Sequence, residues 1–430
     1  VGLSMGASIL MSNYFGARRW HMLKSELATS VIAGFLFTAV LSILSFAGSS
    51  FFIRVTQTPE EIAPMATTYL QIISAGLIFT FFYNVYSSAL RAIGDSRAPL
   101  YVLIITTFIN VFLDIFLVGV LDMGVTGAAI ATVISQFISS VCLILYIRLR
   151  VPILWLTPHE MKLRLVLLKK TVDFSSVSAL QQTVLYLGRL LVQSGVNALG
   201  VHAVAAFNAV SIIDSYVLAP GDSLASSLMT FCAQNRGGKQ YERIPAGFRR
   251  MMGMATGCCA VIAVLVLALR RPLTGIFLKP EETLALAEAM SYLVPMASFY
   301  FLSGITNTFQ GYFRGIGRLN MALAGTFVQI PVRVAVSYAL FSLLGIQAVA
   351  VGTALGWTCM AIFDAFMYRR QPEERSCPPP GRSSAAGANS FSWPPALSGL
   401  KAHPPTLSAA EPGAAFQPFG RRGRVGSGKG

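Results

Sequence analysis

The chain has few charged residues, few cysteines and few histidines for its length. Charged residues make up 12% of its 430 positions, whereas a soluble domain carries about a quarter. The six cysteines include no CxxC pair, and the four histidines show no metal-ligand spacing, so neither a disulfide framework nor a zinc site is indicated. A P-loop and a secretory signal peptide are also lacking, and we expect no direct use of ATP and no cofactor.

One motif that suggests an enzyme fails on its context. Gly2–Gly6 fits the pattern G-x-S-x-G, which in hydrolases needs a sharp turn between a strand and a helix, with histidine and acidic partners. Here the motif lies in an apolar run, where the spacing of its glycines suits close packing of helices. We therefore expect that the protein is not an enzyme.

Long apolar runs are abundant. Hydrophobic residues make up 54% of the chain and form continuous runs, unlike the alternating pattern of a β-barrel. Each run is long enough to cross a bilayer as a helix, so the sequence predicts an all-α polytopic membrane protein. After a partial helix at 1–15, we expect spanning helices at 25–48, 62–92, 99–120, 127–147, 171–196, 201–232, 245–269, 283–313, 317–344 and 347–368.

The net charge of +15 reflects topology and not a nucleic-acid partner. Basic residues gather in alternate loops between the apolar runs, and the positive-inside rule puts these loops in the cytoplasm. We therefore expect a multi-pass protein of the cell membrane. Residues 371–430 are rich in Pro, Gly, Ser and Ala without apolar periodicity, which predicts a disordered or aberrant tail.

An internal repeat divides the chain. Pro59-Glu60-Glu61 recurs as Pro280-Glu281-Glu282, at an offset of 280 − 59 = 221 residues. Arg91-Ala92-Ile93-Gly94 has its counterpart in Arg314-Gly315-Ile316-Gly317, at an offset of 314 − 91 = 223. Six helices separate equivalent points, so the two copies have the same orientation, as in the parallel repeats of secondary transporters.

The repeat predicts two lobes. We expect an N-lobe at 1–147, a cytoplasmic inter-lobe loop at 148–170 and a C-lobe at 171–370. Residue 1 corresponds to about Asp222, and the second copy begins near Lys169, so the first copy lacks about 50 residues (222 − 169 = 53). We therefore expect a chain truncated at its N-terminus, with 12 helices in the intact protein.

Two polar residues lie inside the apolar run at 99–120. Asn110 and Asp114 are four residues apart and share one face of the helix. A carboxylate at membrane depth costs at least about 2.5–3.5 kcal/mol on insertion scales and is rarely idle. Asp114 either hydrogen-bonds a neighbouring helix or forms a proton or cation site on a transport path.

Three runs, GASILMSNYFGARR, SALRAIGDSRAPLYVLIITTFINVFLDIFLVG and IIDSYVLAPGDSLASSLMTFCAQNRGGK, resemble the multidrug and toxic compound extrusion (MATE) family, in particular its bacterial NorM/DinF-like members. The likeness covers about residues 1–370 and both halves. It implies two six-helix lobes around a central cavity, which alternate between inward-facing and outward-facing states. The expected substrates are organic cations and amphiphilic drugs, exported in exchange for H⁺ or Na⁺.

The resemblance also implies a coupling site in the N-lobe. Asn110, Asp114 and Thr132 match an Asn and an Asp of the fifth helix and a Thr of the sixth in related transporters. Independently of the family, the repeat mates of Asn110 and Asp114 are Arg333 and Ser337. Oxygen ligands that suit Na⁺ or a proton therefore concentrate in the N-lobe, and we predict that coupling resides there.

We assign roles to four further charged residues within C-lobe helices. Asp214 matches a common family position, and we assign cavity or gating roles to Asp214, Arg189 and Arg333. A structural role for Arg333, paired with a carboxylate, is an equally good interpretation. We expect Asp364 to be solvated or paired with Arg369 near the cytoplasmic end of its helix.

Three functions remain open at this point. The first is a monomeric, cation-coupled drug antiporter in the bilayer, and the repeat and Asp114 support it. The second is a flippase for lipid-linked saccharides of a related fold, which a wide cationic cavity with a lateral opening would favour. The third is a non-transporting membrane scaffold, which an absence of ion-coupled flux would favour.

Overall fold

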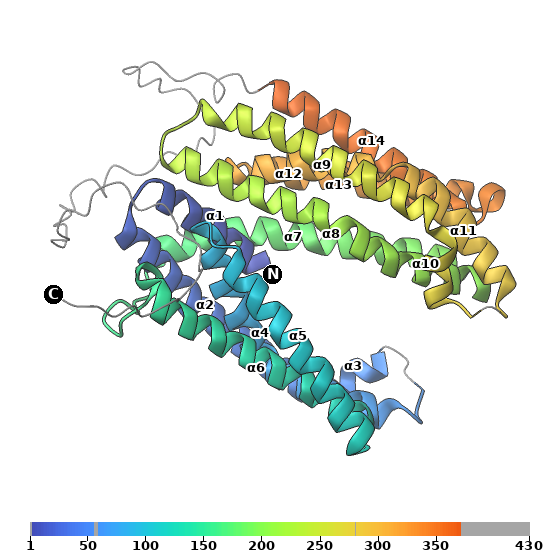
Figure 1. The fold of residues 1–430 in the computed structure, drawn as a ribbon, viewed down its shortest axis with the longest axis horizontal. Helices are drawn as coiled ribbons and strands as arrows, with labels where there is room; N and C mark the ends of the chain where they lie inside the picture. The colour runs from blue at the N-terminus through green and yellow to red at the C-terminus, as the bar shows by residue number, and fades with distance from the viewer. Residues whose placement is uncertain (1, 56–58, 280, 371–430) are drawn as a thin grey trace, which may run out of the picture. The chain divides into compact units, whose positions relative to one another are not determined.

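The computed structural model describes residues 2–55, 59–279 and 281–370, and within these ranges it contains helices and no strand (Figure 1). The predicted all-α fold is confirmed, whereas the predicted tail at 371–430 lies outside the described residues. The N-lobe contains α1 (Gly2–Gly16), α2 (Trp20–Ala47), α3 (Ser49–Val55), α4 (Ala63–Ala92), α5 (Arg97–Asp114), the π-helix η1 (Ile115–Val120) and α6 (Gly124–Arg150).

A short connection with one 3-10 turn, η2 (Pro152–Leu154), leads to the C-lobe. Because α6 continues to Arg150 and α7 begins at Leu165, the connection is shorter than the loop predicted at 148–170. The C-lobe contains α7 (Leu165–Asn197), α8 (Val201–Gly237), α9 (Arg243–Ala268), α10 (Arg270–Phe277), α11 (Thr283–Ser298), α12 (Tyr300–Gly315), α13 (Leu319–Leu344) and α14 (Gln347–Arg369).

Eight of the described helices are long and apolar enough to cross a membrane, namely α2, α4, α5 with η1, α6, α8, α9, α13 and α14. The helices α11 and α12 are long and apolar enough to cross a membrane only when taken together, and a bend of 50° separates them. The predicted helix at 283–313 is therefore broken, at Phe299. Pro295 lies one turn before the break and cannot donate a helical hydrogen bond to the carbonyl of Ser291, which weakens the helix there.

Two connections that the sequence predicts as polar loops contain short helices. Residues 49–55 form α3 and residues 270–277 form α10. In α10 the hydroxyl of Thr274 donates to the backbone carbonyl of Arg270, 2.8 Å away, and the side chain is fully buried. Local hydrogen bonding and burial therefore order a segment whose composition alone suggests a loop.

Within each lobe the helices pack against one another. In the N-lobe, α4 contacts α2 and α6, and α5 contacts α6. In the C-lobe, α8, α9 and α12 pack together and α13 lies along α14. A buried cluster that includes Phe207, Tyr292, Tyr300 and Trp357 forms part of the C-lobe core. The lobes meet where α1 packs against α7 and α8.

The internal repeat is visible in the backbone. Gly94 and Gly317 both have a positive φ, +95° and +78°, and lie 317 − 94 = 223 residues apart. Arg18 and Lys239, with φ of 55° and 58°, are related by an offset of 239 − 18 = 221. Non-glycine residues rarely adopt this conformation, so its recurrence at the repeat offset supports the duplicated architecture.

Candidate functional site

The first turn of α5 is fixed to the end of α6 by Asp95. One carboxylate oxygen of Asp95 accepts hydrogen bonds from the backbone N–H groups of Arg97 and Ala98, at 3.2 and 3.1 Å. Its other oxygen accepts a bond from the Tyr146 hydroxyl at 2.9 Å. Pro99, which cannot donate, sits in this first turn without leaving a donor unsatisfied. The residues further along α5 are thereby held in register with α6.

The α-helical part of α5 ends at Asp114, and the chain continues as the π-helix Ile115–Val120. Such π segments are rare and occur frequently at functional sites. Oδ1 of Asp114 and Nδ2 of Asn110 are buried without a hydrogen-bond partner among the described residues. The hydrogen bond from Asp114 to a neighbouring helix, one of the two interpretations of this residue, does not occur in the described part of the chain. Two unsatisfied polar groups therefore lie one turn apart.

A small polar cavity of about 110 Å³ lies between α4, α5 and α6. Asn110 and Thr132 both line it, so the structure brings these two predicted site residues together, with Asp114 one helical turn beyond. The Thr132 hydroxyl donates to the carbonyl of Ala128, 3.0 Å away, and its oxygen lone pairs remain available as ligands. An amide and a hydroxyl beside a carboxylate can hold a small hard cation or exchange a proton.

The same cavity is lined by Ser135, Gln136 and Ser139, which were not predicted as site residues from the sequence. They lie three, four and seven residues after Thr132, which places all four on one face of α6. That spacing was a usable signal for the polar face. The Ser135 hydroxyl oxygen is also buried without a partner among the described residues, which adds a third unsatisfied group.

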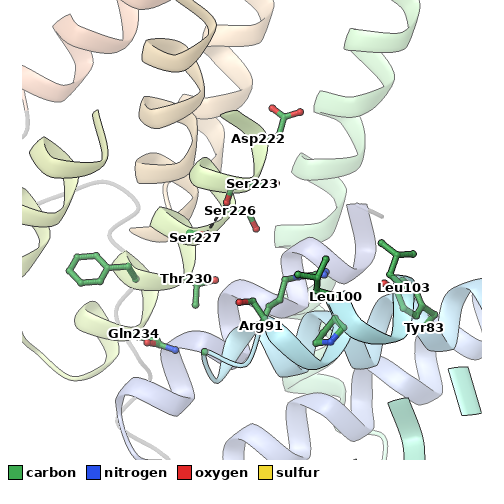
Figure 2. Close-up of a pocket in the computed structure, with 14 residues that line it drawn as sticks. Tyr83, Arg91, Leu100, Leu103, Asp222, Ser223, Ser226, Ser227, Thr230 and Gln234 are labelled. Carbon is green, nitrogen blue, oxygen red and sulfur yellow. Dashed lines mark hydrogen bonds between the residues drawn. The ribbon is translucent and has the colours of Figure 1, made fainter. Parts of the chain in front are cut away.

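A larger cavity of about 730 Å³ lies between the two lobes (Figure 2). On the C-lobe side, polar side chains follow one face of α8 and point into the cavity. These are Asp222, Ser223, Ser226, Ser227, Thr230 and Gln234. On the N-lobe side, Tyr83, Arg91, Leu100 and Leu103 complete the wall. A mixed apolar and polar cavity of this size can take a drug-sized molecule.

Two side chains belong to both cavities. Tyr83 of α4 and Leu103 of α5 line the small polar cavity and the inter-lobe cavity. They lie next to each other in Figure 2, opposite the polar face of α8. Asn110 and Thr132 are therefore separated from the inter-lobe cavity by a wall that these two side chains help to form.

The inter-lobe cavity carries one charge of each sign. The Arg91 guanidinium donates to the hydroxyls of Ser87 and Ser88, at 2.6 and 3.2 Å. Asp222 accepts a bond from the Asn307 amide at 2.9 Å. The two opposite charges leave the cavity without an excess of charge of either sign among its described lining residues.

The three predicted gating residues form a separate group in the C-lobe. Asp214 accepts a short hydrogen bond from the hydroxyl of Tyr300, and its charge interacts with those of Arg333 and Arg189. Within the described residues, none of the three predicted residues lines the inter-lobe cavity. Within the described residues Arg333 forms no ion pair with Asp214, and its Nε atom is buried without a hydrogen-bond partner, so both interpretations of Arg333 stay predictions.

The expectation for Asp364 is wrong. Its side chain is fully buried, and Oδ2 accepts a hydrogen bond from the Gln310 amide at 3.3 Å. Arg369 does not pair with it; the Arg370 guanidinium at the same helix end stacks on the ring of Phe366. Sequence position near a helix end suggested solvent, but α12 and α13 cover this part of α14.

Known proteins are similar to this chain in sequence and in fold. The sequence matches the family MatE over residues 1–116 and 178–339. It is 28% identical over 297 residues to the probable multidrug resistance protein YoeA of Bacillus subtilis, across 67% of the chain and 64% of YoeA. It is 29% identical over 335 residues to the probable multidrug resistance protein YpnP of the same organism, across 76% of the chain and 74% of YpnP.

A solved structure, an outward-facing conformation of a multidrug resistance MATE family transporter of the MOP superfamily, matches with a TM-score of 0.82 at 20% identity. The match covers 86% of this chain and 83% of the other. At this identity the likeness establishes the fold alone.

Proposed function

Because the chain belongs to the MatE family of membrane transporters, we propose that it exports drugs or organic cations in exchange for H⁺ or Na⁺ by alternating access. The inter-lobe cavity is the substrate site in this proposal. Its opposite charges, hydroxyl-lined face and apolar wall suit an amphiphilic molecule with both apolar and polar parts.

The observation that carries the coupling part of the proposal is the pair of unsatisfied groups on α5. A buried polar atom without a partner is costly, and Asn110 and Asp114 each leave one inside the N-lobe. A proton or Na⁺ bound near Asp114 would neutralise the carboxylate, with Asn110 and Thr132 as neighbouring oxygen ligands. Binding of the ion near Asp114 would affect the inter-lobe cavity through Tyr83 and Leu103, whose side chains line both cavities.

The test is ethidium efflux from proteoliposomes, with a proton gradient and a sodium gradient imposed separately. We expect efflux to follow one of the two gradients and to fall to the level of empty vesicles in Asp114→Asn. Asp122→Asn is the matched control, because Asp122 is exposed in the loop after η1 and Asn tolerates its positive φ of 51°.

Efflux that persists in Asp114→Asn under both gradients would contradict the assignment of coupling to this residue. Efflux that fails equally in Asp122→Asn would show that the substitutions disturb the packing of α5 against α6. The loss could then not be assigned to the carboxylate of Asp114. Wild-type vesicles that expel no ethidium and no other amphiphilic cation under either gradient would contradict the proposed function itself.

A further inference from the structure

A hydrogen-bonded chain of side chains crosses the interior of the C-lobe. The Arg314 guanidinium of α12 donates to Oε1 of Gln181 on α7, at 2.9 Å. Nε2 of Gln181 donates to Oε1 of Gln310 on α12, at 2.8 Å. Nε2 of Gln310 then donates to Oδ2 of Asp364 on α14, at 3.3 Å. Every donor points in the same direction, so Asp364 is the final acceptor of a chain that starts at a fixed positive charge.

The Asp364 carboxyl is confined on its other side. Its side chain has 0% exposure, and Oδ1 has no hydrogen-bond partner among the described residues. A Cβ atom on Gly325 of α13 would lie 2.7 Å from this oxygen and 3.1 Å from Nε2 of Gln310. Glycine at this position therefore lets the backbone of α13 approach a buried carboxyl closely.

No cation on the surrounding helices compensates Asp364 directly. The titratable and charged residues of α11, α12, α13 and α14 include Glu288, Tyr312, Arg314, Arg333, Tyr368 and Arg369. In the part of the chain that the structure describes, Asp364 hydrogen-bonds Gln310 and forms no ion pair with any of these groups. An isolated buried carboxylate is costly, and a bound proton removes that cost.

The repeat shows that the fold does not require a carboxyl here. At the offset of 221 residues, Asp364 corresponds to Leu143, which is fully buried in the N-lobe. At the offset of 223, Gln310 corresponds to Ser87, which accepts a hydrogen bond directly from Arg91. At the equivalent positions the N-lobe thus has a leucine and a serine. The amide chain and its terminal carboxyl are particular to the C-lobe.

We propose that Asp364 is a proton-binding site of the C-lobe, distinct from Asp114, whose occupancy is transmitted through Gln310 and Gln181 to Arg314. When Asp364 binds a proton, its hydrogen bond from Gln310 becomes a bond between two neutral groups and is weaker. The polarisation of the hydrogen-bonded side chains between Asp364 and Arg314 then decreases. The charge of Arg314 interacts with that of Asp222, which lines the inter-lobe cavity. The link to transport rests on the proposed function, whereas proton binding by Asp364 does not.

The test is infrared difference spectroscopy on the full chain in lipid nanodiscs, between acidic and alkaline buffers. We expect a band of a protonated carboxyl group that titrates in the wild type and in Asp114→Asn and is absent in Asp364→Asn. A wild-type spectrum without such a band, or a band that Asp364→Asn leaves unchanged, would overturn the proposal.

A second variant keeps the test decisive if Asp364→Asn does not fold. Gln310→Met removes the donor that favours the charged carboxylate at similar volume, so the midpoint of the band should move to higher pH by about one unit. An unmoved midpoint would overturn the proposed chain. Because these readouts need no substrate, they hold even if ethidium efflux fails, so the failure of the transport proposal remains distinguishable.

Discussion

Gly16 and Gly237 make the same contact from opposite sides of the interface between the lobes. A Cβ on Gly16 would overlap the backbone carbonyl oxygen of Gln234, and one on Gly237 would overlap that of Asn13. The offsets are equal, since 237 − 16 = 221 and 234 − 13 = 221. The ends of α1 and α8 therefore meet as two copies of one structural unit, backbone against backbone.

This contact predicts that Gly16→Ala and Gly237→Ala each push α1 and α8 apart. Overpacking of a close contact costs roughly 1–3 kcal/mol, so both variants should lower the thermal midpoint in detergent. Gly253→Ala is the control, because its Cβ would meet nothing within 4 Å. Alanine is favoured over glycine within a helix by up to about 1 kcal/mol, so the control should be neutral or more stable. Equal midpoints in all three variants would contradict the contact.

The wall between the two cavities predicts an effect on ion leak. Leu103→Ala should open the small polar cavity towards the inter-lobe cavity and raise the flux of the coupling ion in proteoliposomes without drug. Leu100→Ala removes the same atoms one turn earlier, from a side chain that lines only the larger of these two cavities. We therefore expect leak in the first variant and none above wild type in the second. Equal leak in both variants would show that Leu103 does not separate the small polar cavity from the inter-lobe cavity.

A buried carboxyl between the lobes predicts a stability effect. Glu26 of α2 has 0% exposure, and its Oε1 lies 2.5 Å from the Thr171 hydroxyl of α7. Thr171→Val keeps the shape but removes this donor, so the free energy of unfolding should fall by about 1–3 kcal/mol. Thr183→Val on the same helix is the control, because its exposed hydroxyl bonds the carbonyl of Ala179. A control that loses as much would refute the role of Glu26.

The inter-lobe connection predicts a pH-dependent contribution. Lys24 Nζ lies 2.9 Å from Glu160 Oε1, and the backbone N–H and hydroxyl of Thr157 bond the same carboxylate. Partial burial acts against the charged form, but the bonds from Thr157 and Lys24 outweigh it, so the pKa of Glu160 lies below its ordinary value. The stabilisation is therefore complete above the ordinary carboxyl range and is lost as the pH falls through the lowered pKa.

Glu160→Gln should remove this contribution. For a partly exposed pair, we expect a loss of about 0.2–1 kcal/mol at pH 7, measured as a lower thermal midpoint. The difference from the wild type should shrink as the pH falls through the lowered pKa of Glu160, where the wild-type carboxylate also becomes neutral. A difference that stays constant down to that pH would contradict the role of the charge.

The sequence predicts the order of the long helices because each apolar run has to be shielded from water along its whole length. It predicts the turns at Gly94 and Gly317 less directly, through the repeat. The burial of Asp364 could not be predicted, because it depends on how closely α13 approaches at Gly325. For the same reason Tyr83 could be placed in the site only once α4, α5 and α6 are assembled.

The short helices α3 and α10 could not be predicted from composition either. In α10, the amphipathic segment Arg270–Phe277 has too few apolar residues to resemble a span and too many to resemble a loop. The bend at Phe299 depends on a proline four residues earlier, and proline within a helix does not always break it. Pro220 lies inside α8, which continues from Val201 to Gly237.

The mirrored contact of Gly16 and Gly237 is the contact that two identical half-length chains would make across a two-fold axis. In such a dimer, both copies would have to carry the same residue at every position. Within one covalent chain the copies were free to diverge, and position 114 holds a carboxyl where position 337 holds a serine. Position 364 likewise holds a carboxyl where position 143 holds a leucine. A single chain can therefore give its two halves different chemical roles, which a symmetric dimer of identical chains could not do.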